Sequence, residues 1–322
     1  MGEKIILRTP NWVGDAVIST SLLPLIKKHF SPASLYLQVH PRVKDVFLNN
    51  PYVDGFLILG KDRIRERFDL GILFTNSFSS ALIFFLSGVK KRVGYATDGR
   101  RILLTHPVPL PPNWKTMPQV DYYLGILRFL GMEGKKAGYQ LYLTSEEIQK
   151  SREIFKLKKP FVAFFPGAAY GSAKRWPVER FAELAYRLQK RFGFQPYILG
   201  SRRECFLGEI IENIYPSVIN LVGKTSLREA MAITAQANLA VTNDSGAFHI
   251  AIALDVPVVA IFGPTPVEKT RPFYGKISVV KKEVKCSPCK YRVCPFLHQC
   301  MMEVMVDDVE RAIEKLLEGK NA

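Results

Sequence analysis

The stretch Phe161-Val-Ala-Phe-Phe-Pro-Gly-Ala-Ala-Tyr-Gly-Ser-Ala-Lys-Arg-Trp-Pro177 decides the fold class. It begins with an apolar run typical of a buried strand, continues into a loop with two glycines and adjacent cations, and ends at Pro177, where a helix is predicted to start. Backbone N–H groups and a cation beside a helix N-terminus form an anion site that suits a phosphate. The alternative is a mobile surface loop with two solvated cations.

Strand-like and helix-like segments alternate on both sides of this stretch, and the pattern restarts after the charged segment Glu146 to Lys159. The expected strands are Ile5–Leu7, Ser34–Val39, Gly55–Leu59, Asp69–Phe74, Phe161–Phe165, Pro196–Leu199, Val218–Leu221, Leu239–Thr242 and Val258–Phe262. The expected helices are Ala16–Phe30, Ser80–Leu86, Val178–Arg191, Leu227–Gln236, Gly246–Leu254 and Asp307–Glu318. This alternation predicts parallel sheets with crossover helices.

The restart predicts two Rossmann-like α/β domains, residues 1–158 and 159–322, joined at the basic segment Lys156–Pro160. A length of 322 residues also favours two domains, at about 150 residues each. Ligands of open α/β sheets bind at the carboxyl ends of the strands. We therefore expect the domains to face each other across a cleft, with the site built from the loops that follow the strands.

Composition narrows the class of partner. Apolar residues make up 48% of the chain, which excludes a disordered or fibrous protein. Forty-five Lys and Arg against 29 Asp and Glu give a net charge of +16, which favours nucleic acid, a phosphate-bearing small molecule or an acidic membrane surface. Nucleic acid is not expected, because neither aromatic stacking platforms nor a known binding module is present.

Two apolar segments bear on location. The N-terminal sequence contains an acidic residue and only a short apolar run, so we expect no signal peptide and a cytoplasmic protein. Residues Leu70 to Val89 carry no charge, but Thr75-Asn76-Ser77 and Ser79-Ser80 interrupt them. A spanning helix needs about 20 predominantly apolar residues. We therefore predict a strand, a polar loop and a buried helix there.

Two polar loops follow predicted strands. In the first, Gly14 and Asp15 stand at the mouth of a helix, where Asp15 is either a helix cap or a general base for a substrate hydroxyl. The Gly-x-Gly-x-x-Gly dinucleotide pattern is absent there. The second, Thr242-Asn-Asp-Ser-Gly246, leads into a helix that contains His249. Its polar residues either cap that helix or contact a phosphorylated ligand, and His249 either lies in the core or lines the site.

Basic residues are dense in the first domain. They include Arg63, Arg65, Arg67 and Arg92. Arginine suits bidentate recognition of carboxylates and phosphates, so these four are candidates for binding an acidic acceptor at a membrane surface. The alternative is a solvated helix face.

Four cysteines, Cys286, Cys289, Cys294 and Cys300, lie within fifteen positions, with His298 among them. In a cytoplasmic protein such a cluster indicates a structural metal before disulfides. The spacing is not that of a standard zinc finger, so zinc, disulfides and free thiols that pack a loop all stay open.

Several motifs together resemble those of the bacterial lipopolysaccharide heptosyltransferases of glycosyltransferase family 9. The matching segments are Asn11-Trp-Val-Gly-Asp15, Pro166-Gly-Ala with Ala173-Lys-Arg-Trp-Pro177, Thr242-Asn-Asp-Ser-Gly246 with His249, and Cys286-Ser-Pro-Cys289 through Cys300-Met301. They run from residue 11 to 301 in the family's order, so the resemblance covers nearly the whole chain. Within the family, the pattern is most similar to the type II enzymes.

The resemblance implies a two-domain glycosyltransferase B fold, with ADP-heptose bound by the C-terminal domain and heptosyl-Kdo₂-lipid A by the N-terminal domain. The implied transfer inverts the anomeric centre and requires no metal or other cofactor. A monomer at the cytoplasmic face of the inner membrane is the expected form. The alternative is a type I enzyme or a family member with another acceptor.

The resemblance also assigns roles to residues. Asp15 matches the general base, and Lys174 matches the lysine that contacts the ADP phosphates and offsets charge on the leaving group. The implied donor-binding residues are Gly14, Ala169, Tyr170, Ser172, Lys174, Glu204, Thr225, Asp244, Ser245, Gly246 and His249. Ala169 and Tyr170 stand where some type I enzymes place hydroxyl residues, so backbone N–H groups or Ser172 would have to contact the phosphate here.

Overall fold

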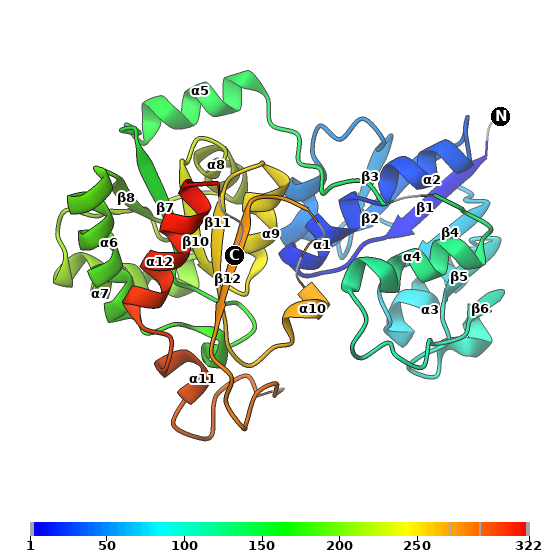
Figure 1. The fold of residues 1–322 in the computed structure, drawn as a ribbon. Coiled ribbons are helices and arrows are strands. Elements are labelled where there is room, and N and C mark those ends of the chain that lie inside the picture. The colour runs from blue at the N-terminus through cyan, green and yellow to red at the C-terminus, as the bar shows by residue number, and fades with distance from the viewer. Residues whose placement is uncertain (1–2, 135, 271, 273, 290, 320–322) are drawn as a thin grey trace. The chain divides into compact units, whose positions relative to one another are not determined.

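The computed structural model describes residues 3–134, 136–270, 272, 274–289 and 291–319. The chain divides into two compact units, an N-terminal unit from Met1 to Tyr142 and a C-terminal unit from Leu143 to Ala322. Each unit is built on a six-stranded parallel sheet with helices on both faces (Figure 1). This confirms the predicted class of two Rossmann-like α/β domains.

In the N-terminal unit the strand order is β3-β2-β1-β4-β5-β6. The strands are β1 (Lys4–Arg8), β2 (Ser34–Val39), β3 (Gly55–Ile58), β4 (Leu70–Leu73), β5 (Lys91–Tyr95) and β6 (His106–Val108). The helices are α1 (Val13–Thr20), α2 (Leu23–His29), α3 (Phe78–Leu86) and α4 (Gln119–Phe129), with 3₁₀ turns η1 (Pro41–Phe47) and η2 (Arg100–Leu103). Helices α1 and α4 pack together on one face of the sheet, and α3 packs on the other.

The helix expected from Ala16 to Phe30 is two helices, α1 and α2. Pro24 lies in the first turn of α2, and in a continuous helix its ring would clash with the carbonyl of Thr20. The hydroxyls of Ser19 and Ser21 also donate to carbonyls one turn back, at 2.7 Å each, which competes with regular helix geometry. The chain therefore bends between the two helices.

The uncharged segment from Leu70 to Val89 forms strand β4, a polar loop and helix α3, as predicted. Ser77 caps α3 by accepting a hydrogen bond from the backbone N–H of Ser80. Among the residues that the structure describes, no helix is long and apolar enough to cross a membrane.

In the C-terminal unit the strand order is β12-β11-β10-β7-β8-β9. The strands are β7 (Phe161–Phe165), β8 (Gln195–Ile198), β9 (Ile219–Asn220), β10 (Leu239–Asn243), β11 (Val258–Phe262) and β12 (Ile277–Lys281). The helices are α5 (Ser145–Ile154), α6 (Val178–Phe192), α7 (Cys205–Ile214), α8 (Leu227–Thr234), α9 (Gly246–Ala253), α10 (Val267–Thr270), α11 (Gln299–Met302) and α12 (Val306–Leu317), with 3₁₀ turns η3 (Ser172–Lys174) and η4 (Arg202–Glu204).

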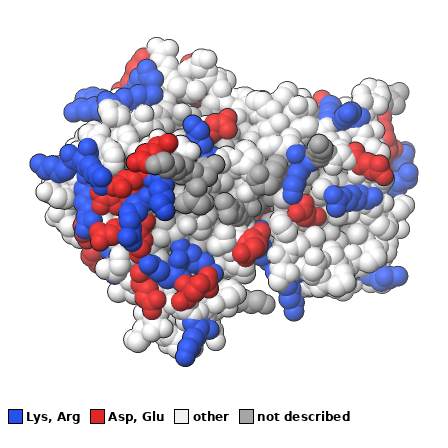
Figure 2. Space-filling view, viewed as in Figure 1, with Lys and Arg blue, Asp and Glu red and all other residues white. Residues whose placement is uncertain are grey.

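Helices cover both faces of this second sheet (Figure 1). Helices α6, α7 and α12 pack on one face, and α8 and α9 on the other. Basic residues of α6 pair with acidic residues of α12, as in the bridge between Arg187 and Glu310 at 3.0 Å. Blue and red side chains accordingly alternate over this region in Figure 2.

The boundary between the units lies before the position expected from the sequence. The segment Lys156–Pro160 is held inside the C-terminal unit, because the hydroxyl of Tyr197 in β8 donates to the carbonyl of Lys156 at 3.1 Å and accepts from the N–H of Lys158 at 2.9 Å. Helix α5 also belongs to this unit, since Glu147 pairs with Arg228 of α8 at 2.6 Å. The division therefore moves from residues 158 and 159 to Tyr142 and Leu143.

Candidate active site

The order of strands places a switch point in each sheet. The chain reverses its direction of growth between β1 and β4 in the first sheet and between β7 and β10 in the second. Open α/β sheets bind ligands at the carboxyl ends of the strands beside such a point. The loop with Gly14 and Asp15 follows β1, and the loops with Lys174 and Asp244 follow β7 and β10. The sequence-predicted residues thus lie at the switch points of two separate units.

A buried ion pair forms the centre of the C-terminal site. Nζ of Lys174 lies 2.5 Å from Oδ2 of Asp244, and the two side chains are 12% and 4% exposed. The hydroxyl of Thr265, which follows β11, donates to the same carboxylate oxygen at 2.6 Å. Asp244 therefore fixes the ammonium group of Lys174, and any negative charge that binds here would meet a cation already held in place.

The N-terminus of α9 lies directly after Asp244. Ser245 is the residue that precedes the helix, and Gly246 is its first residue. The hydroxyl of Ser245 lies 3.1 Å from that of Thr242. The side chain of Ser245 does not cap this helix, and the first N–H groups of a helix have no partner within the helix itself. A helix N-terminus of this kind attracts anions such as phosphate.

Asn243 joins the two loops of the site. Its side chain is fully buried; Nδ2 donates to the carbonyl of Pro166 at 2.8 Å, and Oδ1 accepts from the N–H of Trp176 at 3.0 Å. One amide thus ties the end of β10 to both ends of the loop that contains Lys174. Replacing it would leave buried backbone groups unpaired.

The Cys-rich segment supports the Lys174 loop from the other side. The carbonyl of Arg292 accepts a hydrogen bond from the N–H of Ala173 at 3.0 Å, and Nε2 of His298 lies 2.8 Å from the carbonyl of Ala173. A Cβ at Gly171 would lie 2.2 Å from the carbonyl oxygen of Arg292. Glycine is therefore required at residue 171 for the two backbones to approach this closely.

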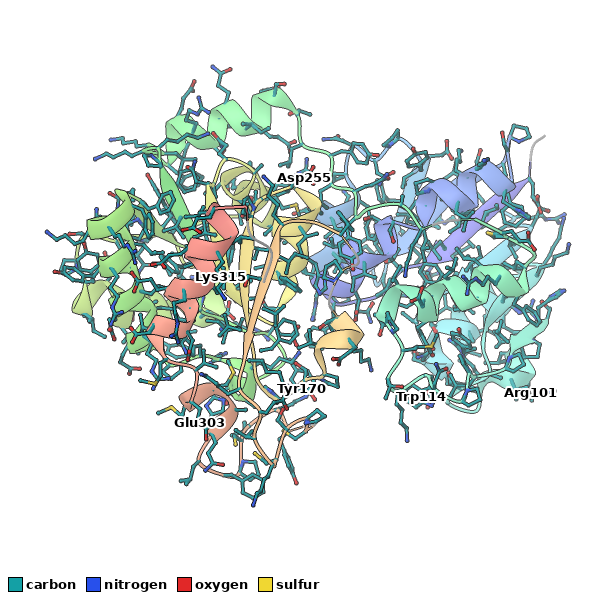
Figure 3. The ribbon with its side chains drawn as sticks, viewed as in Figure 1. Arg101, Trp114, Tyr170, Asp255, Glu303 and Lys315 are labelled. Carbon is teal, nitrogen blue, oxygen red and sulfur yellow. The ribbon has the colours of Figure 1, made fainter. Side chains whose placement is uncertain are left out.

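Tyr170, labelled in Figure 3, is half-buried and lies near two cations. Nζ of Lys174 and the guanidinium carbon of Arg292 lie 5.1 and 5.4 Å from the centre of its ring, within the range of cation–π attraction. Its neighbours Ala169 and Ser172 are exposed. The loop thus presents exposed backbone and one hydroxyl beside a rigid cation.

His249 lies in the second turn of α9 and is buried. Burial is the main cause that lowers its pKa to about 4; the carboxylate of Asp244 acts in the opposite direction, and Lys174 adds to the lowering. The imidazole is therefore neutral at pH 7 and lies near the ion pair. Because the side chain is buried, the structure favours the alternative in which His249 is a core residue over the one in which it contacts a ligand.

Glu204 and Thr225 lie on the β8 and β9 side of the switch point. The carboxylate of Glu204 accepts hydrogen bonds from the N–H and hydroxyl of Ser201, at 2.9 and 2.6 Å. A Cβ at Gly167 would lie 2.0 Å from Oε1 of Glu204, so the glycine leaves room for this carboxylate beside the end of β7. Thr225 is half-buried just before the Ser226 cap of α8.

In the N-terminal unit, Gly14 and Asp15 are half-buried in the first turn of α1. Asp15 is not the residue that precedes the helix, as Trp12 has that position, although an acidic group in the first turn is still favourable. Burial raises the pKa of Tyr123 in α4 well above its usual range, and the nearby carboxylate of Asp15 raises it further. The loop before α1 is fixed by the buried Arg8, which donates to Oδ1 of Asn11 at 2.8 Å.

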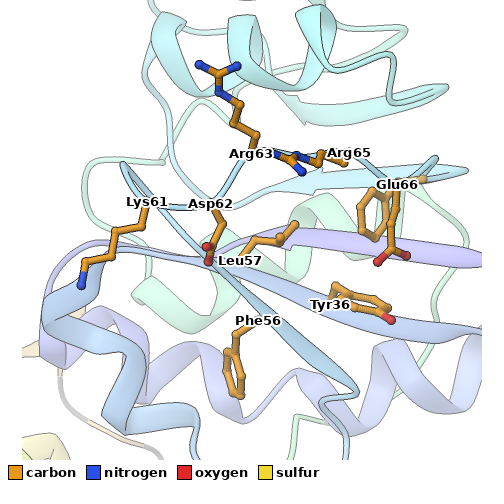
Figure 4. Close-up of a pocket in the computed structure, with 9 residues that line it drawn as sticks. Tyr36, Phe56, Leu57, Lys61, Asp62, Arg63, Arg65 and Glu66 are labelled. Carbon is orange, nitrogen blue, oxygen red and sulfur yellow. The ribbon is translucent and has the colours of Figure 1, made fainter.

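A pocket of about 530 Å³ lies where the loop between β3 and β4 covers the sheet (Figure 4). Its lining includes Lys61, Arg63 and Arg65 together with the apolar or aromatic side chains of Tyr36, Phe56, Leu57 and Phe68 and the carboxylates of Asp62 and Glu66. Arg67 is exposed on the same loop but lies outside the set of described residues that line the pocket.

Arg92 does not join these arginines. Its Nε donates to the carbonyl of Leu103 at 2.7 Å and its Nη1 to the carbonyl of Val89 at 2.6 Å, and burial lowers its pKa. The guanidinium is therefore committed to backbone groups of its own unit. Arg92 also lies outside the described residues that line the pocket, and its role in acceptor binding stays a prediction.

The four clustered cysteines carry free thiols. Burial, together with the neighbouring Cys286, Cys289 and Cys294, raises the pKa of the Cys300 thiol to about 11. Within the described parts of the chain, no set of three or more His, Cys, Asp or Glu side chains has the arrangement of a metal site.

Four residues of the site are missing from the predicted site residues: Asn243, Thr265, Arg292 and His298. Asn243 and His298 lie in motifs that the sequence singled out, but their contacts with the Lys174 loop were not predicted. Thr265 follows β11 in Gly263-Pro-Thr265, so the rule about strand ends could have found it. Arg292 and His298 act through contacts with Ala173, more than a hundred residues earlier in sequence, and no local pattern indicates those contacts.

Comparison with known proteins adds a family and a set of similar chains. The model of glycosyltransferase family 9 (heptosyltransferase) matches residues 58–299. Lipopolysaccharide heptosyltransferase 2 of Escherichia coli strain K12 is 31% identical, over 86% of this chain and 88% of its own. Lipooligosaccharide heptosyltransferase 2 of Haemophilus influenzae is 30% identical over the same shares. The solved structure of E. coli ADP-heptose LPS heptosyltransferase II aligns with a TM-score of 0.84 at 27% identity and covers 99% of this chain and 100% of that one.

Proposed function

The chain belongs to glycosyltransferase family 9, the heptosyltransferase family, and is a glycosyltransferase; on that premise we propose that it moves heptose from ADP-heptose to the first heptose of heptosyl-Kdo₂-lipid A. The relatives that match it over most of their length are type 2 enzymes of the lipopolysaccharide or lipooligosaccharide core, which favours the type II reaction over type I. The observation that supports the donor most directly is the Lys174–Asp244 pair beside the N-terminus of α9.

The diphosphate of the donor would bind between Lys174 and the first turn of α9. Lys174 supplies a full positive charge, and the N–H groups after Ser245 and Gly246 supply hydrogen bonds and the positive end of a helix dipole. Asp244 acts as a positioning residue, because its carboxylate is already occupied by Lys174 and Thr265. The backbone of Ala169 and the hydroxyl of Ser172 complete the exposed side of this anion site.

The nucleoside would lie on the other side of the end of β7. There Glu204 and Thr225 mark the loops that follow β8 and β9. The carboxylate of Glu204 retains acceptor capacity suited to the hydroxyls of a ribose. The proposed donor thus extends along the carboxyl edge of the sheet, with its phosphates at the switch point.

In the proposed reaction, Asp15 accepts the proton of an acceptor hydroxyl as its oxygen attacks the anomeric carbon. The bond from that carbon to the diphosphate oxygen breaks, the configuration inverts, and ADP leaves with the bonding electrons. Lys174 stabilises the charge that develops on the diphosphate, an interaction stronger in the transition state than in the ground state. The positive charge comes from the chain itself, so we propose that transfer proceeds without a resident metal.

The acceptor is proposed to bind the N-terminal unit at the cytoplasmic face of the inner membrane. Arg63 and Arg65 line the pocket under the β3–β4 loop, and Arg67 extends from the same loop. Kdo₂-lipid A carries carboxylates and phosphates, which arginine side chains recognise with paired hydrogen bonds. Aromatic side chains in the pocket floor would contact the sugar rings.

Mass spectrometry of the lipid product tests the proposal. Purified protein is incubated with ADP-heptose and either Kdo₂-lipid A or its mono-heptosylated form, with and without excess EDTA. We expect one added heptose on the heptosylated acceptor only, unchanged by EDTA. Addition to Kdo₂-lipid A itself would identify a type I enzyme, and absence of transfer to both acceptors would refute the proposed reaction.

A further inference from the structure

Helix α3 is unusual for a surface helix because it has no charged residue. Its sequence is Phe78-Ser-Ser-Ala-Leu-Ile-Phe-Phe-Leu86, and residues 80, 81 and 84 face the core. On the opposite face, Phe85 and Leu86 are 47% and 73% exposed. A helix that carries apolar side chains on its exposed side as well as its core side is normally buried further, in protein or in lipid. Nine residues are too few to span a bilayer, so this face suits a position within a membrane interface.

The 3₁₀ turn η2 extends the apolar face. Ile102 is 82% exposed, the highest value among the large hydrophobic residues described. Arg92 connects it to α3, because its guanidinium carbon lies 5.3 Å from the centre of the Phe85 ring while its Nε donates to the carbonyl of Leu103. The exposed side chains of Phe85, Leu86 and Ile102 thus lie on two elements that Arg92 joins, and we call them the α3–η2 patch.

A buried arginine makes this patch rigid. Arg100 is fully buried, and its guanidinium donates to the carbonyls of Tyr95 and Thr75, at 2.9 and 2.5 Å, and to the hydroxyl of Ser80 in α3 at 3.3 Å. The turn η2 is thus fixed to both α3 and the sheet. The exposed side chains of the patch are presented by a rigid support, as a docking surface requires.

Charge identifies what the patch fits. Residues 77–115 contain six Lys and Arg but a single acidic residue, Asp98. Lys91 and Arg101 at the rim are exposed, and no ion pair among the described residues holds them. Figure 3 labels Arg101 at the outer edge of the N-terminal unit. Apolar side chains that insert, surrounded by cations that meet phosphates, are typical of a surface that binds anionic lipid.

We propose that the α3–η2 patch is the membrane-docking surface of this protein, with Phe85, Leu86 and Ile102 inserted among the acyl chains and Lys91 and Arg101 on anionic headgroups. The inference rests on the proposed function in one respect: a lipid-anchored acceptor gives the enzyme a reason to stay on the bilayer. The observations that support it are independent of the donor and acceptor sites. A bilayer is favoured over a second protein chain because the exposed cation Arg101 directly precedes Ile102 in η2, and the exposed Lys91 directly precedes Arg92, which joins the two elements of the patch.

Vesicle flotation tests the docking surface without donor or acceptor. The full-length protein is mixed with phosphatidylcholine vesicles, with or without about 30% phosphatidylglycerol, and the bound fraction is measured against lipid concentration. We expect binding to the anionic vesicles, reduced about tenfold or more by Phe85→Ser with Leu86→Ser, since each side chain loses most of its apolar transfer free energy. Lys91→Gln with Arg101→Gln should reduce binding about tenfold or more to anionic vesicles only.

Matched controls separate docking from general loss of apolar surface. Ile214→Ser with Leu317→Ser removes two exposed apolar side chains from the C-terminal unit, and vesicle binding should stay as in the wild type. Circular dichroism and thermal melting verify that every variant is folded. Equal binding by the wild type and the Phe85/Leu86 variant, or no binding by the wild type, would overturn the proposal. So would a wild-type dimer that the same variant converts to a monomer on size exclusion.

Activity on a deacylated, water-soluble acceptor distinguishes this proposal from the proposed function. We expect the patch variants to transfer heptose to the soluble acceptor at the wild-type rate, and to lose rate only with acceptor embedded in vesicles. Absence of transfer by the wild type, with vesicle binding intact, would refute the reaction and leave the docking surface. Normal transfer by the wild type, with vesicle binding unchanged by the substitutions, would refute the docking surface and leave the proposed reaction.

Discussion

Removing the carboxylate of Asp244 should destabilise the empty C-terminal unit and make it depend on its ligand. In Asp244→Asn, the ammonium of Lys174 loses the partner 2.5 Å away while its side chain stays almost nine-tenths buried. Leaving one member of a buried pair uncompensated costs about 3–5 kcal/mol. In a unit of this size each kcal/mol lowers the Tm by about 2–4 °C, so we expect a fall of roughly 6 °C or more.

ADP should recover much of this loss, because its diphosphate supplies the missing negative charge next to Lys174. Differential scanning calorimetry with and without ADP measures both effects, and the shift caused by ADP should be larger in Asp244→Asn than in the wild type. Glu283→Gln is the matched control, since the Glu283 side chain that pairs with Lys281 is 83% exposed and ion pairs with an exposed partner contribute about 0–1 kcal/mol. A Tm of Asp244→Asn within 2 °C of the wild type would refute the reasoning.

Three further substitutions examine other parts of the site. Asp15→Asn should lower kcat by about 10² to 10⁴ with unchanged ADP affinity, measured by steady-state kinetics and calorimetric titration, and near-normal turnover would remove Asp15 from the mechanism. The pKa of His249 is about 4 in the folded chain and about 6.5 in the unfolded chain, so the unfolded state binds the proton first as the pH falls. Between pH 6.5 and pH 4 the free energy of unfolding should therefore fall by about 3 kcal/mol more in the wild type than in His249→Asn, measured by denaturant unfolding at each pH. An equal fall in both proteins would contradict this. Gly171→Ala places a Cβ against the carbonyl of Arg292 and should displace the Lys174 loop, which we expect to weaken ADP binding at least tenfold. An unchanged Kd would show that the Cys-rich segment can move away without disturbing the site.

The period of the hydrophobic pattern was enough to predict nine of the strands and the fold class. The strands that escaped prediction are β5, β6 and β12. Strand β5 begins with the charged Lys91 and Arg92 and has only three buried residues after them, too few to show a strand pattern. Strand β6 has only three residues. Helix α5 was also missed, although Thr144 and Glu147 form the capping box that marks a helix start.

The candidate site was predictable to the extent that strand ends determine it. Lys174 and Asp244 lie together because β7 and β10 are neighbours, which follows from the order of strands. The sequence could not show that Asp244 is occupied by Lys174, because that depends on side-chain directions in the folded unit. The same holds for Arg92. The sequence shows it only as one of several basic residues and cannot show that it donates to the backbone carbonyls of Leu103 and Val89.

The contact between the Lys174 loop and the Cys-rich segment limits how this chain can be recombined with its relatives. The backbone of Arg292 touches Gly171, and His298 meets the carbonyl of Ala173, so the two segments have a shared shape although they are far apart in sequence. A chimaera that takes residues 165–176 from one parent and 284–300 from another would join surfaces that were never fitted to each other. Exchange of donor specificity between family members should therefore succeed only when both segments are transplanted together.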